Sequence, residues 1–284
     1  MILKALDSGY LKKKFLQFQW GGNSLVALCV SVFSGIVLSL QYNPAEPYFS
    51  VNSIDIMLPF GAFWRSLHFY SSQLFFLLSL VHLTAIFISG YHIQLTNWLR
   101  LIGSLPVLIL LLFTGYVLRA DATGESAGII AENIVLSVPY LGNVSNELLF
   151  AISTEGLKRV YANHMIGLCV LWLVLSWDHV RRYSVVWRQH GVLLVGLFVF
   201  CLLLDAPMEP HHPGVFHIAG PWFFLGMQEL LRYIQPFWAG IVFPVTLLAA
   251  LAVMLSEKWR RYAVAYVFVW LGGYSVLTFF SLIR

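Results

Sequence analysis

The chain has 284 residues, of which 59% are hydrophobic and only 11% are charged, and its mean hydropathy is +0.78. A soluble domain of ordinary composition is about 45–50% apolar and about 25% charged. No water-soluble core could bury this much apolar surface, so the composition excludes a soluble protein and indicates a chain whose main solvent is lipid. The net charge of +4 follows from basic residues between the apolar segments and requires no nucleic-acid partner.

Seven apolar segments are long enough to cross a bilayer, whose core of about 30 Å needs about 20 helical residues. We expect them at approximately 22–42, 66–90, 98–118, 160–180, 190–206, 236–256 and 262–282. The first 20 residues mix lysines with leucines, which predicts an amphipathic stretch on a membrane surface. The sequence therefore predicts an all-α integral membrane protein of about seven transmembrane helices.

The loops between these segments predict an orientation. With seven spans, the amino terminus and the loops near 91–97, 181–189 and 257–261 share one side, which holds eleven of the 17 basic residues. The positive-inside rule makes that side cytoplasmic. The two longer connections, 119–158 and 207–235, then face outward and are expected to form short helices at the membrane surface. A mild break near 183–190 predicts an amino-terminal four-helix domain, 1–189, and a carboxy-terminal three-helix domain, 190–284.

Four histidines lie inside two of the predicted spans. His68 and His82 are 14 residues apart on one helix, and His164 and His179 are 15 apart on another. At about 100° and 1.5 Å per residue, both intervals return a pair to nearly one helix face, about 21 Å apart along the axis. Both spans are even-numbered and run in the same direction. His68 and His164 therefore share the outer level, and His82 and His179 share the inner level.

Two facing imidazoles at each level suit two b-type haems, an outer one held by His68 and His164 and an inner one held by His82 and His179. A single histidine on an apolar helix is more often a hydrogen-bonded core residue. That alternative does not explain four histidines with matched spacing, because ionisable groups inside a membrane are costly and usually functional. The three cysteines form no C-x-x-C-H motif, so no covalently attached c-type haem is expected.

Three residues near these histidines suit the same cofactor. Arg65 lies one turn outside His68, where its guanidinium could pair with a haem propionate, although an interfacial arginine that snorkels is the alternative. Gly21 and Gly35 are also 14 apart. Glycines at that interval would let two flat macrocycles approach the backbone at the two levels, whereas taken alone they would be ordinary helix packing.

These segments resemble the cytochrome b subunit of the cytochrome bc complexes over most of the chain. Segments 20–29 (WGGNSLVALC) and 35–42 (GIVLSLQY) resemble the family's first helix with its two haem-flanking glycines. Segment 64–68 (WRSLH) resembles the second helix, Trp98 with 115–118 (GYVL) resembles the third, and 159–164 (RVYANH) resembles the fourth. The 14-and-15 spacing is similar to the chloroplast-type branch, and four plus three spans look like a fusion of that branch's two chains.

The resemblance implies quinol oxidation at the outer face, in a pocket between the two long connections. One electron would leave to a mobile partner, and the other would cross through the outer and inner haems to a quinone near the cytoplasmic face. Implied partners are lipid, quinone and a Rieske protein, c-type cytochrome or iron–sulfur subunit, with a homodimer as a further option and an energy-transducing membrane, the bacterial inner membrane, as the location. The implied site residues are Trp98 and Gly115 at the cofactors and Tyr116, Trp222, Phe223, Asp121 and Glu229 at the quinol site.

Several positions depart from the family's pattern. Where the third helix of the family ends in Pro-Trp-Gly, this chain reads LRADA at 118–122. Segment 220–223 (GPWF) stands at the family's Pro-Glu-Trp-Tyr quinol motif, so Pro221 replaces the glutamate implied to accept a quinol proton. A relocated carboxylate could serve instead, with Glu229, Asp121 and Glu125 as candidates, although each could be a solvated interfacial acid.

Other differences concern the inner level and the loops. Leu101 stands at the inner-level glycine of the third helix, with Gly103 nearby, and Gln19 argues against the additional covalent haem of the chloroplast-type branch. His92 and His190 are expected to be solvated in cytoplasmic loops. The remaining cluster suits a metal or partner contact or a plain polar loop; it comprises His211, His212 and His217.

Two other classes of function compete with this interpretation. A di-haem membrane anchor for a peripheral dehydrogenase or reductase would need one quinone site and no electron bifurcation, and the missing motif glutamate favours it. A transporter or scaffold without redox chemistry would leave the histidine spacing unexplained. The sequence favours transmembrane electron transfer as one subunit of a quinol:electron-acceptor oxidoreductase.

Overall fold

The computed structural model describes residues 8–89, 93–210 and 218–283. Within these ranges the regular elements are helices, and no strand occurs. Two shorter apolar helices, Trp187–Leu203 and Trp238–Val253, lie at the fifth and sixth predicted spans. The all-α membrane fold predicted from the sequence is confirmed. Five helices are long and apolar enough to cross a membrane: Lys12–Ser39, Gly61–Ser89, Leu95–Val117, Lys158–Val180 and Arg260–Leu282.

The chain divides into two compact units, and neither is continuous in sequence. The first contains residues up to Tyr42, Asn52–Ile93 and His179–Pro207, and the second contains Asn43–Val51, Gln94–Asp178 and the chain from Met208 onward. Helix α4 (Pro47–Met57) contributes residues to both. The predicted domain boundary at residue 189 follows chain order rather than these units, and it stays a prediction.

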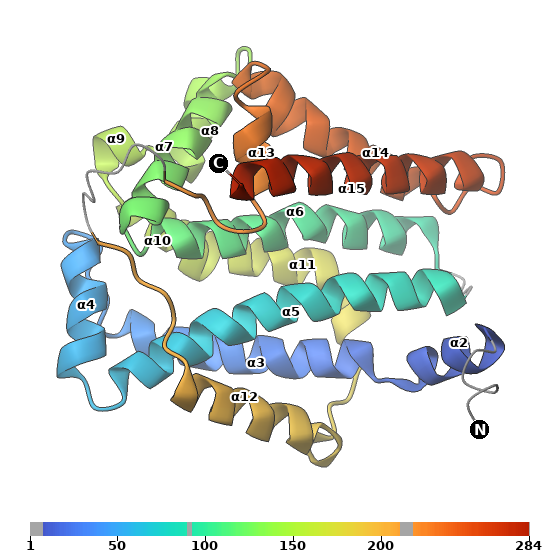
Figure 1. Cartoon of the computed structure of the whole chain (residues 1–284), viewed down its shortest axis with the longest axis horizontal. Helices are drawn as coiled ribbons and strands as arrows, with labels where there is room; N and C mark the ends of the chain where they lie inside the picture. The colour runs from blue at the N-terminus through green and yellow to red at the C-terminus, as the bar shows by residue number, and fades with distance from the viewer. Residues whose placement is uncertain (1–7, 90–92, 211–217, 284) are drawn as a thin grey trace. The chain divides into compact units, whose positions relative to one another are not determined.

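In the first unit, α3 (Trp20–Ser39) packs along α5 (Gly61–Ser89), as Figure 1 shows. Helix α12 (Gly191–Leu203) packs on α5 and follows the short helix η2 (Trp187–His190), while α2 (Ser8–Gln17) precedes α3. Side chains from three helices form a common core, because each helix is apolar around most of its circumference. The buried members of that core are Val30, Leu67, Leu197 and Cys201.

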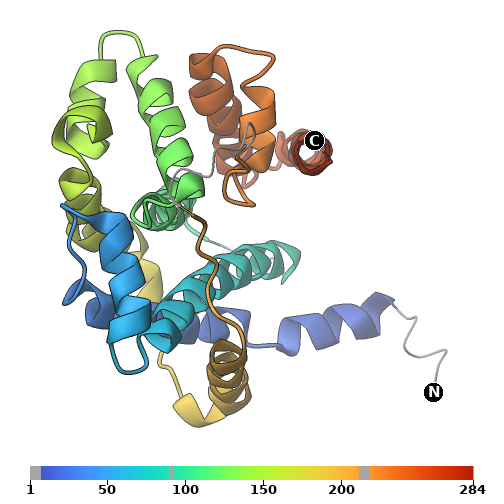
Figure 2. The ribbon, with the colours of Figure 1, turned by 60° about the vertical axis from the view of Figure 1, so that its left-hand side comes forward.

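The second unit begins with α6 (Leu95–Val117). The chain turns at Ala120, whose φ of 49° is left-handed, and enters α7 (Ala122–Leu136) with Asp121 as its amino-terminal cap. The rest of the unit is visible in green, yellow and red in Figure 2. It contains α8 (Gly142–Leu149), α9 (Ile152–Glu155), α10 (Lys158–Ala162), η1 (Asn163–Gly167), α11 (Leu168–Val180), α13 (Leu225–Leu230), η3 (Trp238–Val242), α14 (Phe243–Val253) and α15 (Arg260–Leu282).

Close packing of α13 on α15 determines where the loop before α13 lies. A Cβ on Gly226 would come within 2.8 Å of the Tyr274 ring, so a glycine is needed at this approach. Tyr274 itself stacks on Trp270, with ring centroids 5.1 Å apart. Its hydroxyl donates to the carbonyl of Phe223 at 2.6 Å. The segment that resembles the quinol motif is therefore held by a side chain of the last helix.

Candidate haem and quinone sites

His68 lies on α5 of the first unit and faces α3. Its Nδ1 lies 2.8 Å from the carbonyl oxygen of Ser31. A carbonyl can only accept, so Nδ1 carries the hydrogen and the lone pair resides on Nε2. A Cβ on Gly35 would come within 2.8 Å of the ring's Cε1, so the absence of a side chain there admits the imidazole. His68 is held in the tautomer that can bind a metal through Nε2.

His164 reaches the same chemical state in the second unit. Its Nδ1 lies 2.9 Å from the hydroxyl of Thr114, and that hydroxyl also lies 2.7 Å from the carbonyl of Leu110. Because the hydroxyl's one hydrogen goes to the carbonyl, it accepts from Nδ1–H of His164. Gly115 is the neighbouring residue, and a Cβ there would approach Cε1 of His164 to 3.4 Å. His164 lies in η1, a single π-helical turn of the kind that often marks functional sites.

The two histidines of the inner level belong to one unit and lie together. The ring centroids of His82 and His179 are 5.8 Å apart, and the ring of Tyr183 lies 5.4 Å from that of His179. A Cβ on Gly21 would come within 2.8 Å of Cε1 of His82. The Nε2 atom of His82 is buried and makes no hydrogen bond within the described residues. A buried nitrogen without a polar partner is unfavourable unless a ligand uses it.

These observations fit a haem iron. The donors are imidazoles, the tautomers of His68 and His164 place the lone pair on Nε2, and His82 has a buried Nε2 atom that an axial bond would satisfy. Glycines on α3 and α6 face three of the four imidazoles. The residues therefore fit axial ligation of b-type haem.

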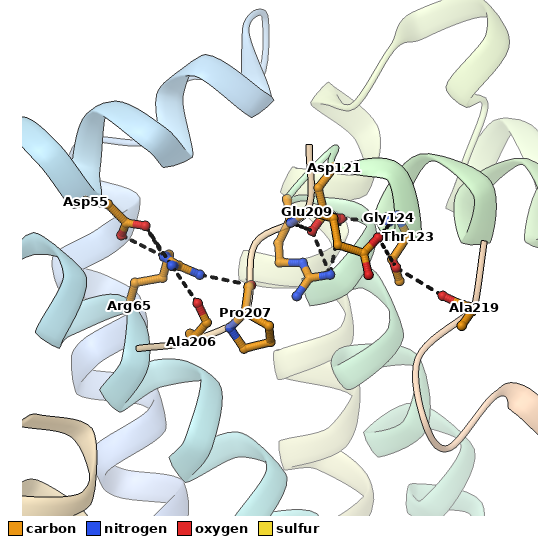
Figure 3. A network of polar contacts seen from close by, with 10 residues as sticks. Asp55, Arg65, Asp121, Thr123, Gly124, Ala206, Pro207, Glu209 and Ala219 are labelled. Atoms are coloured by element: carbon orange, nitrogen blue, oxygen red, sulfur yellow. Dashed lines mark hydrogen bonds and ion pairs between the residues drawn. The ribbon is translucent and has the colours of Figure 1, made fainter. Parts of the chain in front are cut away.

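Arg65 is engaged by protein groups, as Figure 3 shows. Its guanidinium forms an ion pair with Asp55 at 2.6 Å and donates to the carbonyls of Ala206, at 2.8 Å, and Pro207, at 3.3 Å. The arginine thus ties α4 and α5 to the chain that follows α12. A propionate would have to share this guanidinium with Asp55, so pairing with haem stays a prediction.

Trp98 is nearly fully buried at the start of α6. Its indole N–H donates to the carbonyl of Leu251 on α14 at 2.9 Å. This hydrogen bond gives Trp98 a structural role within the second unit. The proposal that Trp98 also contacts a cofactor stays a prediction. Gly103 lies on the same helix, where a Cβ would meet no atom within 4 Å.

His190 was expected to be solvated, and that expectation is wrong. Its exposed fraction is 3%, and its Nδ1 lies 2.7 Å from the amide oxygen of Asn23 on α3. A Cβ on Gly22 would come within 2.8 Å of the ring's Cε1. His82 and His190 therefore pack against consecutive glycines of α3. The feature of the sequence that could have indicated this burial is the pair of glycines at 21 and 22. One glycine suffices for a haem ligand at this level, and the second leaves room for another ring against α3.

Aromatic rings surround the segment at 220–223 in the second unit. The rings of Tyr116 and Phe223 lie 5.8 Å apart, edge to face, and the guanidinium of Arg119 lies 4.6 Å from the centre of Tyr116. Pro221 is fully buried, whereas Trp222 is 45% exposed. The structure therefore brings together two of the predicted quinol-site aromatics and leaves Trp222 at the surface of the unit.

Asp121 is fully buried in a polar network, drawn in Figure 3. Its carboxylate accepts from the backbone N–H of Gly124 at 2.9 Å and of Glu209 at 3.1 Å, and it pairs with Arg119 at 2.8 Å. The hydroxyl of Thr123 lies 2.6 Å from the Glu209 carboxylate. This network joins the start of α7 to the connection that begins at Met208. Asp121 thus caps the amino terminus of α7 and holds the backbone at Glu209 against it.

The other carboxylate candidates differ in exposure. Glu125 is exposed on α7, whereas Glu229 on α13 has an exposed fraction of 1%. His92 and the cluster of His211, His212 and His217 lie outside the described residues, so the hypotheses for them stay as predictions.

The fold and the facing histidines define a helical membrane protein equipped to bind haem, and comparison with known proteins agrees. A family model described as cytochrome b/b6/petB matches residues 8–189. Cytochrome b of Chondrus crispus is 23% identical over 278 residues, which cover 84% of this chain and 73% of that protein. Cytochrome b6 of Heliobacterium mobile is 29% identical over 153 residues, which cover 51% of this chain and 72% of the relative.

A solved structure described as a hyperthermophilic respiratory Complex III has the same fold, with a TM-score of 0.70 at 21% identity, over 93% of this chain and 83% of that one. The family match covers more than half of the chain. The chain therefore belongs to the cytochrome b/b6 family. It is accordingly a b-type haem protein that transfers electrons in an energy-transducing membrane.

Proposed function

We propose that the chain is the di-haem subunit of a respiratory quinol-oxidising complex. Quinol is oxidised at the outer face, and electrons pass through the outer and then the inner haem to a quinone near the cytoplasmic face. His82 and His179 hold the inner haem, and His68 and His164 hold the outer one. The pairing of His68 with His164 rests on the spacing of the histidines in the sequence, because His68 belongs to the first unit and His164 to the second.

One observation supports the proposal: histidines at the predicted ligand positions have hydrogen bonding that is compatible with metal ligands, each within its own unit. Nδ1 of His68 and of His164 donates to a local acceptor, and Nε2 of His82 is buried without a hydrogen bond. A purely structural histidine gains nothing from a buried Nε2 atom that makes no hydrogen bond within the described residues. Bound haem supplies a one-electron carrier at each level. The protein orients the imidazoles through these contacts.

A polar cluster beside the inner pair supports quinone reduction there. His190 and Asn23 are both buried, and Gln19 donates to Gln189 at 3.0 Å in the same unit. The amide oxygen of Asn23 accepts from Nδ1–H of His190, so Nε2 is the atom that exchanges a proton with a quinone oxygen. The excess of basic residues in the loops of this side favours a cytoplasmic position for this cluster, which in a bacterium is the inner face of the inner membrane.

Proteins that accept the outer electron lie outside this chain. A Rieske protein, a c-type cytochrome or an iron–sulfur subunit would fill that role, and a second copy of the chain would complete a dimer of such a complex. Pro221 in place of the motif glutamate supports the alternative of a di-haem anchor with one quinone site, because that change removes a carboxyl group from the outer segment.

The His190→Leu variant separates the two functions. If quinol enters at the outer face, decylubiquinol or reduced dimethylnaphthoquinone should still reduce both haems in isolated membranes, while their reoxidation by added quinone slows about tenfold or more. The haem spectrum of the variant should match that of the wild type. If the chain is an anchor with a single inner site, the substitution will abolish haem reduction and reoxidation together.

A further inference from the structure

Glu229 is a buried carboxylate on a helix of a membrane protein. It lies on α13, which begins directly after the segment 220–223, and its exposed fraction is 1%. Its neighbours Leu225 and Met227 are buried and apolar. An ionisable group in such surroundings is unfavourable for folding and usually has a function.

The carboxylate contacts two side chains that are exposed. The Tyr233 hydroxyl donates to Oε1 at 2.7 Å, and Nε of Arg232 lies 3.2 Å from Oε2. Tyr233 is 61% exposed, and the Arg232 side chain is 41% exposed. An arginine side chain this exposed lies where water or lipid headgroups can solvate it. Glu229 is thus one step from solvent through a hydroxyl that can exchange protons.

The competing carboxylates lack this arrangement. Asp121 holds two backbone N–H groups and Arg119, so protonating it would weaken the cap of α7 and the tie to Glu209. Glu125 is exposed and needs no relay to reach water. Glu132 on α7 is buried, but its carboxylate accepts from the Asn146 side chain at 2.8 Å and the Ser153 backbone at 3.2 Å. Its role is to hold the turn between α8 and α9.

The segment before α13 places an aromatic surface six residues upstream of Glu229. Phe223 has its carbonyl held by Tyr274 and its ring against Tyr116, and Pro221 occupies the position of the family's motif glutamate. Proline has no proton acceptor on its side chain. A proton acceptor needs to be buried near its substrate and connected to solvent, and Glu229 is the candidate acid that meets the burial and connection requirements.

We infer that Glu229 accepts the protons released by quinol at the outer site and passes them to solvent through Tyr233. The inference rests on the proposed function. As one quinol O–H bond breaks, its proton binds the Glu229 carboxylate and one electron leaves to an iron–sulfur or c-haem partner protein. The resulting carboxylic acid gives its proton to the Tyr233 hydroxyl, which releases one to water. The restored carboxylate takes the second proton as the second electron passes to the outer haem.

The test uses the complete complex in membranes and follows haem reduction by decylubiquinol or reduced dimethylnaphthoquinone. Glu229→Gln should keep the wild-type haem spectrum and content but reduce the haems about 100-fold more slowly. Its rate should also lose the rise with pH that a carboxylate acceptor gives the wild type. Glu229→Asp should recover much of the rate, and Tyr233→Phe should slow reduction less than Glu229→Gln does.

Glu132→Gln is the matched control, since it makes the same change at a buried acid that has no exposed relay, and its reduction rate should equal that of the wild type. The inference is overturned if Glu229→Gln reduces its haems at the wild-type rate with the wild-type pH profile. Failure of the wild type itself to be reduced by quinol would overturn the proposed function as well, so the two failures are distinguishable.

Discussion

The histidines of the first unit and the carboxylates of the second differ in how strictly the proposed chemistry fixes their residue type and their position in the sequence. The rings of His82 and His179 face each other, with their centroids 5.8 Å apart. At the outer segment, Pro221 stands where an acid belongs, and the buried acid is Glu229, eight residues later. A metal ligand must place one atom at bonding distance, so both its type and its position are constrained. A proton acceptor needs only burial, reach and a route to solvent, so its position along the chain can change.

The largest expected effect concerns the inner level. His82→Ala should remove one of two haems from each polypeptide, because a bis-histidine site that loses one ligand no longer holds iron between two strong donors. The measurement is the ratio of haem to protein in the purified complex. His190→Leu is the matched control, since it removes a histidine that also packs against a glycine of α3 but is not a proposed ligand, and it should retain both haems. Equal loss in the two variants would contradict the distinction between them.

The second prediction concerns the glycines. Gly35→Val should weaken or abolish the outer haem, because even a Cβ there would come within 2.8 Å of the His68 ring, and the imidazole would have to leave its position. Gly103→Ala is the control, since a Cβ at that site meets nothing within 4 Å. Absorbance spectra of the two variants test this directly. An outer haem unaffected by Gly35→Val would mean that α3 moves away from α5 at little cost.

The smallest effect is expected at Arg65. If its guanidinium lies near a haem propionate, Arg65→Gln should lower the midpoint potential of the outer haem by about 60 mV, a tenfold change for a one-electron couple. Asp55→Asn should shift the potential in the opposite direction, because it frees positive charge. Redox titration of the two variants measures both shifts. Unchanged potentials together with a lower melting temperature would show that Arg65 only ties α5 to the chain after α12.

Much of the fold was predictable, since long apolar segments can only be helices in lipid. The spacing of His68 and His82 was readable because it repeats with the helical period. Contacts between distant residues were not. The burial of His190 depends on Gly22 and Asn23, more than 160 residues earlier, and a histidine between arginines and a glycine looks like a solvated loop. The pair of Arg65 with Asp55 likewise depends on how α4 turns into α5.

The candidate haem ligands could be predicted from the sequence because two haem levels require histidines at a fixed helical spacing. The proton acceptor could not be predicted as well, because no fixed spacing applies to it. Glu229 could be named as one of three candidate acids, but its sequence context does not show that it is buried. Tyr233 lies four residues further on, beyond the end of α13, and only the folded chain brings its exposed hydroxyl within 2.7 Å of the carboxylate.

The most direct test of the central claim is a dithionite-reduced minus oxidised absorbance spectrum of the purified chain, combined with extraction and quantification of its haem. The account predicts b-type haem at two per polypeptide, falling to one in His82→Ala. A purified, folded chain that contains no haem, or whose haem content does not depend on His82, would contradict it.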